Sequence, residues 1–159
     1  MSDKNLEIRA SIQIAKPVHE VFEAIVNPEQ MSNYFISKSS GRLEEGKTVL
    51  WSWPEMEGEY PVKAIKIDKD KYISFYWGED LDNENPKRLL VEIKLDTYKN
   101  DTVVKVTEKS MPNDEKGINW LKGNTEGWAN FLACMKAWLE YGVHLRKGAF
   151  DFSFDKDYK

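Results

Sequence analysis

The hydrophobic residues between Gly127 and Arg146 recur at intervals of three and four positions. This spacing places side chains on one side of an α-helix, and it predicts a helix over that range. The apolar face would consist of Trp128, Phe131, Leu132, Met135, Trp138, Leu139 and Gly142. A face this wide has to lie against a second apolar surface. We therefore expect the helix to be held by a curved sheet formed by the rest of the chain.

Most of the remaining chain shows the two-residue alternation of half-buried β-strands. From Leu6 to Ile14, every second side chain is apolar and those between are polar or charged. The predicted strands cover residues 6–14, 37–43, 48–53, 59–67, 71–77, 88–97 and 101–109. Short turns separate most of the later strands, which is typical of an antiparallel sheet.

Two short helices are predicted after the first strand. Pro17 suits the first turn of a helix, Asn27-Pro28 ends that helix, and a second one begins at about Pro28. Residues 110–124 contain proline and glycine and predict a linker before the long helix. The class is α+β, with about six or seven strands in one domain at residues 1–148 and a tail at residues 149–159.

Composition narrows the possible functions. The six Trp, seven Tyr and seven Phe exceed what a core of this size needs, so some rings should line a cavity, with a ring-rich core as the alternative. The net charge of −4 and the scattered lysines argue against nucleic acid as a partner. One cysteine and the absence of any long apolar run argue against disulfides, a signal peptide and membrane insertion, so a cytoplasmic location is expected.

Several segments together resemble the START-like (SRPBCC, helix-grip) superfamily. They are Pro17-Val18-His19-Glu20-Val21-Phe22-Glu23-Ala24, Asn27-Pro28-Glu29, Tyr34-Phe35, and Gly127-Trp128 with Phe131-Leu132. Within that superfamily the chain looks like the branch related to the C-terminal domain of the activator of heat-shock protein 90 ATPase. The resemblance implies a helix-grip fold with a deep cavity between sheet and helix, and it supplies no shared catalytic residues. It does not cover the tail.

The residues offer little support for catalysis. Cys134 has no histidine near it in sequence, and it falls at the edge of the apolar helix face, so a packed thiol is favoured. His19 and His144 lie outside the apolar faces of their predicted helices and make no zinc site with one cysteine. The acidic loop at residues 78–86 lacks the EF-hand pattern, so a solvated loop is favoured over a calcium site. No phosphate loop or dinucleotide fingerprint predicts a cofactor.

Glu108 is the most interesting acidic residue. Counting by twos from Val104 and Val106 places it on the inward face at the end of its strand. A carboxyl group there could hydrogen-bond a ligand or act as a general acid or base. The alternative is that the strand has already ended and that Glu108 lies on the wet rim.

The candidate pocket combines Glu108 with large side chains on inward faces. The full set is Tyr34, Phe35, Trp51, Trp53, Trp77, Glu108, Trp120, Trp128 and Met135. Ordinary core packing is the alternative for each of the rings, and Trp120, in the predicted linker, could instead close the pocket as a lid.

Three functions remain open. The first is a module that binds an apolar or aromatic small molecule. The second is a partner of a chaperone of the heat-shock protein 90 class, although the N-terminal chaperone-binding domain of the full activator is not seen in this sequence. The third is an enzyme acting on a bound aromatic or polyketide-like substrate.

Overall fold

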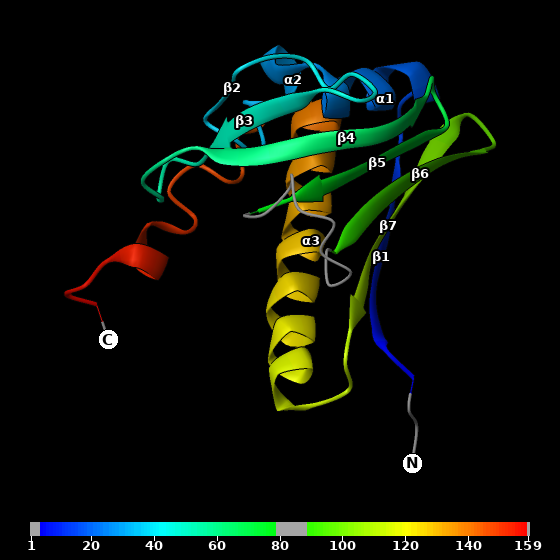
Figure 1. The fold of residues 1–159 in the computed structure, drawn as a ribbon. Helices are drawn as coiled ribbons and strands as arrows, with labels where there is room; N and C mark the ends of the chain where they lie inside the picture. The colour runs from blue at the N-terminus through cyan, green and yellow to red at the C-terminus, as the bar shows by residue number, and fades with distance from the viewer. Residues whose placement is uncertain (1–3, 79–88, 159) are drawn as a thin grey trace.

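The computed structural model describes residues 4–78 and 89–158. Seven antiparallel strands form one curved sheet in the order β1-β7-β6-β5-β4-β3-β2. The long helix α3 runs along the concave side of this sheet, and α1 and α2 lie at one end of the helix (Figure 1). The predicted α+β helix-grip fold is confirmed. The elements are β1 (Leu6–Ile14), α1 (Val18–Val26), α2 (Pro28–Met31), β2 (Lys38–Ser39), β3 (Thr48–Ser52), β4 (Tyr60–Asp68), β5 (Tyr72–Trp77), β6 (Leu90–Tyr98), β7 (Asp101–Met111) and α3 (Glu115–Tyr141).

The strands bury the faces that their alternation predicts. In β1, Ile8 and Ile14 are fully buried while Glu7 and Arg9 are in the exposed half of the pattern. β7 pairs with β1 on one side and with β6 on the other. Glu108 in β7 therefore lies opposite Ile8 and Val91, between the edge strand β1 and β6. Only the second strand is much shorter than predicted, because residues 40–43 leave the sheet.

Helix α3 begins twelve residues earlier than predicted, so the expected linker at residues 110–124 is wrong from Glu115 onward. Asp114 caps the helix, since its side chain accepts a hydrogen bond of 2.7 Å from the backbone N–H of Gly117. A Cβ atom at Gly117 would lie 1.9 Å from the carbonyl oxygen of Pro112, so this glycine lets the chain turn tightly into the helix. Gly117 therefore marks a close approach of the helix to the backbone of Pro112 and not a break in the helix.

The helix also ends earlier than predicted. Gly142 has a φ of 66°, and its backbone N–H bonds to the carbonyl groups of Ala137 and Trp138, which is a left-handed C-cap. His144 and Arg146 therefore lie beyond the helix, in a C-terminal segment defined here as residues 142–158. That segment leads away from the helix axis and contains a short 3₁₀ turn, Asp151–Phe154 (Figure 1).

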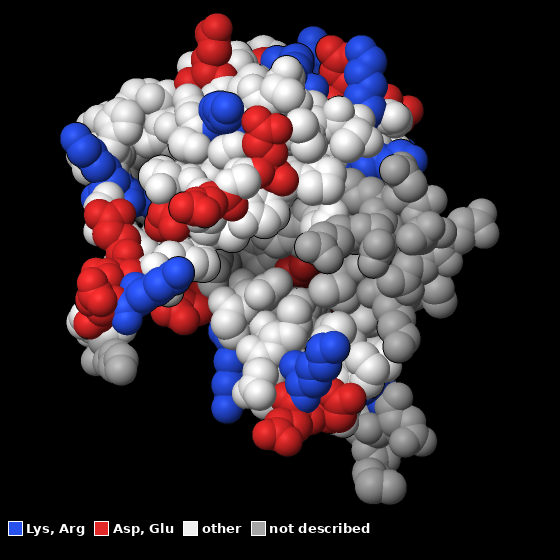
Figure 2. All heavy atoms as spheres, turned by 60° about the vertical axis from the view of Figure 1, so that its left-hand side comes forward, with Lys and Arg blue, Asp and Glu red and all other residues white. Residues whose placement is uncertain are grey.

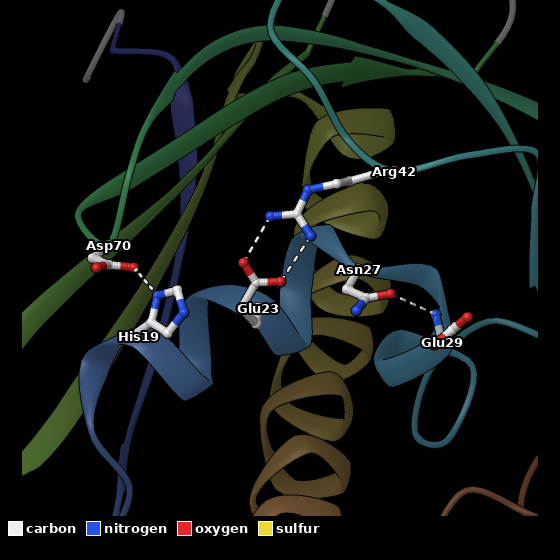
Figure 3. Close-up of polar contacts among 6 residues, drawn as sticks. All are labelled: His19, Glu23, Asn27, Glu29, Arg42 and Asp70. Carbon is white, nitrogen blue, oxygen red and sulfur yellow. Dashed lines mark hydrogen bonds and ion pairs between the residues drawn. The ribbon is translucent and has the colours of Figure 1, made fainter.

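Polar contacts fasten α1 to the loops around it (Figure 3). The Nδ1 atom of His19 lies 2.9 Å from an oxygen of Asp70, in the turn between β4 and β5. Both nitrogens at the end of the Arg42 side chain bond to the carboxylate of Glu23 at 2.7 Å. Asn27 caps α2 by accepting a bond from the N–H of Glu29. These contacts hold the first helices over the end of the sheet.

The predicted acidic loop lies almost entirely outside the described residues. None of the helices that the structure describes is long and apolar enough to cross a membrane.

The packing of α3 against the sheet generates the first prediction. Phe131 is 1% exposed, and replacing it with Ala should lower the free energy of unfolding by about 3–5 kcal/mol because a large buried ring leaves a cavity. Tyr141, on the same helix and 72% exposed, is the control, and Tyr141→Ala should cost less than about 0.5 kcal/mol. Urea denaturation measures both changes. Similar losses at the two positions would contradict this packing.

The Glu23–Arg42 pair predicts a dependence of stability on pH. The hydrogen bond from Arg42 lowers the pKa of Glu23, so the folded state favours its ionised form. The stabilisation is therefore complete above the unfolded pKa and is lost as the pH falls through the lower folded value. Because both side chains are partly exposed, we expect less than about 1 kcal/mol.

The measurement compares urea midpoints of the wild type and Glu23→Gln at pH 7 and pH 3. The difference between the two proteins should shrink at the lower pH. Glu20→Gln, on the same helix and exposed, should show no such change. A Glu23→Gln difference that is constant with pH would refute the assignment.

Candidate ligand-binding cavity

A cavity of about 610 Å³ lies between the N-terminal half of α3, the end of β5 and the C-terminal segment. Figure 2 shows this hollow on the face that carries the C-terminal segment. Its volume is within the range of pockets that hold drug-sized ligands. The described residues that line it are Phe35, Glu55, Met56, Trp77, Gly123, Asn124, Glu126, Gly127, Trp128, Asn130, Phe131, Arg146, Phe150, Phe152, Ser153 and Phe154.

Two glycines of α3 open the cavity on the helix side. Gly123 and Gly127 are four residues apart, so they share one face of the helix, and both line the cavity. A Cβ atom built at either position meets no other atom within 4 Å. Glycine inside a helix costs about 1 kcal/mol relative to alanine. The helix therefore gives up stability at two positions where packing would tolerate a side chain.

Two stacked indoles form the inner wall. The rings of Trp77, from β5, and Trp128, from α3, lie 5.2 Å apart at an angle of 29°. Phe131 meets Trp128 edge-on at 5.2 Å, and Phe35 meets Phe131 edge-on at 4.8 Å. Such edge-to-face contacts fix ring orientation as well as burying area. The wall is consequently a rigid aromatic surface joining a strand, a short helix and the long helix.

Glu108 lies behind this wall and is fully buried. One carboxyl oxygen accepts hydrogen bonds from the indole N–H of Trp128 at 2.9 Å and from the side-chain amide of Asn124 at 3.2 Å. The other accepts from the indole N–H of Trp77 at 3.0 Å. The inward prediction for this side chain is therefore right, but its oxygens bind protein donors. Glu108 positions the two indoles.

A buried ion pair holds the opposite side of the cavity. Arg146, in the C-terminal segment, donates two hydrogen bonds to the carboxylate of Glu55, which follows β3. Their side chains are only 16% and 6% exposed. The guanidinium carbon also lies 4.9 Å from the ring centre of Phe150 and 5.9 Å from that of Phe35. The pair connects the C-terminal segment to the loop after β3, and the charges of its two members cancel.

The candidate residues fall into two groups. Phe35, Trp77 and Trp128 line the cavity, and Glu108 supports them from behind. The others do not line it: Tyr34, Trp51 and Met135 are at most 1% exposed in the core, Trp53 packs half-buried beside Phe35 and Trp77, and Trp120 lies in α3 rather than in a linker.

The contribution of the C-terminal segment to the cavity was not predicted from the sequence. Arg146 was assigned to the helix, and Phe150, Phe152 and Phe154 lie in the predicted tail. Three phenylalanines within five residues of an otherwise polar tail were an available signal that this tail contacts the rest of the domain. The pairing of Arg146 with Glu55 joins positions 91 residues apart and had no signal in the sequence.

The remaining reactive groups lie away from the cavity. Burial raises the pKa of the Cys134 thiol, which disfavours a nucleophilic thiolate. His19 is on α1 and pairs with Asp70. Within residues 4–78 and 89–158, no three His, Cys, Asp or Glu side chains are grouped to hold a metal ion.

The Glu108 network generates a prediction about stability. Glu108→Gln replaces one acceptor oxygen with an amide that also donates, so at least one buried N–H group loses its partner. We expect a loss of about 1–3 kcal/mol in the free energy of unfolding, measured in urea. Glu126→Gln, an exposed site on α3, is the control and should change stability by less than about 0.5 kcal/mol. Equal midpoints for the two variants would show that the network is not formed.

Comparison with solved structures places the fold among proteins of related architecture. The Staphylococcus saprophyticus protein SSP2350 is 30% identical, with a TM-score of 0.75 over 87% of this chain and 94% of that one. The Aha1 dimer from Colwellia psychrerythraea is 19% identical, with a TM-score of 0.72 over 86% and 98% of the two chains. DynU16, from the dynemicin biosynthetic locus, is 18% identical, with a TM-score of 0.72 over 89% of this chain and 49% of that one.

No match was found among curated protein sequences. A family model matches residues 15–140, from just after β1 almost to the end of α3. That range contains Glu108, both indoles and both glycines of the cavity. The chain belongs to the family of activator of Hsp90 ATPase homolog 1-like proteins.

Proposed function

We propose that this protein binds a small aromatic molecule in the cavity between α3, β5 and the C-terminal segment. The observation that carries the proposal is the pair Gly123 and Gly127, which leave the cavity open although a side chain would fit at both positions. A packed core would favour alanine or a larger residue there, because glycine weakens a helix. A retained opening next to stacked indoles is typical of a binding site.

The lining supports binding in preference to a reaction. Arg146 and Glu55 are held by each other, and the carboxyl group of Glu108 is held by three N–H donors. The remaining carboxylate of the lining, Glu126, is exposed to solvent. A general acid or base needs a free position beside the reacting atom. The aromatic wall offers shape and stacking instead, which favours carrying or sensing a ligand. We also infer that the protein acts in the cytoplasm, because its single cysteine can form no intrachain disulfide.

Interaction with a chaperone of the heat-shock protein 90 class is the second candidate. The family match favours it. Addition of the protein to such a chaperone should then change the rate of ATP hydrolysis. An unchanged rate at saturating concentrations would remove this candidate and leave the first untouched.

The proposal predicts that flat aromatic compounds quench tryptophan fluorescence saturably and raise the melting temperature, since a ligand that binds only the folded state stabilises it. Gly127→Leu should abolish both effects, because the new side chain enters the cavity without meeting another atom near its Cβ. The variant should remain folded, with a melting temperature at or above that of the wild type.

Ala129→Leu is the matched control, since residue 129 is exposed on the same helix and does not line the cavity. It should bind like the wild type. If the wild type and both variants give flat titrations with neutral, cationic and anionic aromatic compounds, the cavity is not a binding site for this class.

A further inference from the structure

We propose that the ligand of this cavity is an organic cation: an aromatic compound that carries an ammonium group. The inference rests on the proposed function and adds the chemical class of the ligand. Three independent properties of the lining support it: its one cationic side chain is already paired, its net charge is negative, and its rings already hold a cation.

The main donors that could bind an anion are already engaged with carboxyl groups of the protein. The indole N–H groups of Trp77 and Trp128 and the side-chain amide of Asn124 all donate to the carboxyl group of Glu108. Arg146 donates to Glu55. A buried carboxylate on a ligand needs several donors to replace its water. Among the described lining residues, a ligand carboxylate would find the uncharged side chains of Asn124, Asn130 and Ser153. The remaining N–H groups of Arg146 belong to a cation whose charge is already paired with Glu55.

The charges that line the cavity sum to one negative unit. Glu55 and Glu126 supply two carboxylates, and Arg146 supplies one guanidinium group. Glu55 and Arg146 cancel each other as a close ion pair. Glu126 is exposed at the rim, and no lysine or arginine in the described part of the chain forms an ion pair with it. Lys122, one helical turn before Glu126, does not line the cavity. A cation entering the cavity therefore passes a carboxylate that is not held in an ion pair, whereas an anion is repelled by it.

The aromatic lining is suited to a positive charge. The faces of Trp, Tyr and Phe rings attract cations, and indole does so most strongly. The cavity already contains one example, since the guanidinium group of Arg146 lies against the rings of Phe35 and Phe150. The cavity lining thus contains both a carboxylate, that of Glu126, and the indole rings of Trp77 and Trp128, the two kinds of group that attract an ammonium ion.

Three probes with one aromatic body test the inference. They are 2-naphthylmethylamine, which is protonated at neutral pH, 2-naphthylmethanol and 2-naphthoate, each titrated into the protein in a calorimeter. We expect the amine to bind about three- to tenfold more tightly than the alcohol, and the carboxylate at least about tenfold more weakly than the amine. The preference for the amine should fall as salt rises, because Glu126 is exposed to screening ions.

Two variants of α3 test whether the preference for the amine depends on Glu126. Glu126→Gln should reduce the ratio of amine to alcohol affinity by about two- to fivefold while leaving alcohol affinity unchanged. Glu115→Gln removes the same charge eleven residues away on the same helix, about 16 Å along its axis, and should leave the ratio unchanged.

Each result decides between the two proposals. If the alcohol or the carboxylate binds as tightly as the amine, the cation inference is wrong while the binding function stands. The inference is equally wrong if Glu126→Gln and Glu115→Gln have the same effect on the ratio. If none of the three probes binds, the inference fails together with the proposed function.

Discussion

A carboxyl group buried on the inner face of a sheet has to be surrounded by hydrogen-bond donors, and Glu108 imposes this requirement on the elements packed against the concave face. The neighbouring strands cannot supply these donors, because the residues opposite Glu108 are the apolar Ile8 in β1 and Val91 in β6. They come from β5 through Trp77 and from α3 through Asn124 and Trp128. The two α3 donors lie one turn apart on the helix. Sliding or rotating α3 by one turn, about 5.4 Å, would leave the carboxyl group without them.

The same requirement shapes the cavity. Because both indole N–H groups point at Glu108, the rings are fixed in a stack and present carbon rather than donors to a ligand. Gly123 directly precedes Asn124 and Gly127 directly precedes Trp128, so the segment that anchors the helix also opens the space beside it. The stability lost at these glycines is offset by the hydrogen bonds to Glu108 and by the apolar face further along the helix. Anchoring and opening are thus two properties of one stretch of α3.

The sequence predicted those parts of the fold that depend on local periodicity. The alternation in β1 and the spacing of Phe131, Leu132 and Met135 report burial directly, so seven strands and the buried part of α3 could be predicted. The first turns of α3 could not, because Gly117 and Gly123 lower helix propensity while their reasons for being there are tertiary. The two-residue alternation along the strands also predicted that Trp51 and Glu108 face inward. It could not distinguish a fully buried position from one that borders a cavity, since that depends on what covers it.

The C-terminal segment shows why the cavity was harder to predict than the fold. Its side chains are largely exposed, with Phe152 and Phe154 both at 55%, so burial does not hold it in place. The contact that does so is the ion pair of Arg146 with Glu55, supported by the rings of Phe35 and Phe150. A buried ion pair gains little over apolar packing, but breaking it by removing one partner is costly. Such a contact suits a segment that has to be placed accurately without adding to the core. It leaves the half-exposed rings of Phe152 and Phe154 at the cavity, where a ligand can complete their burial.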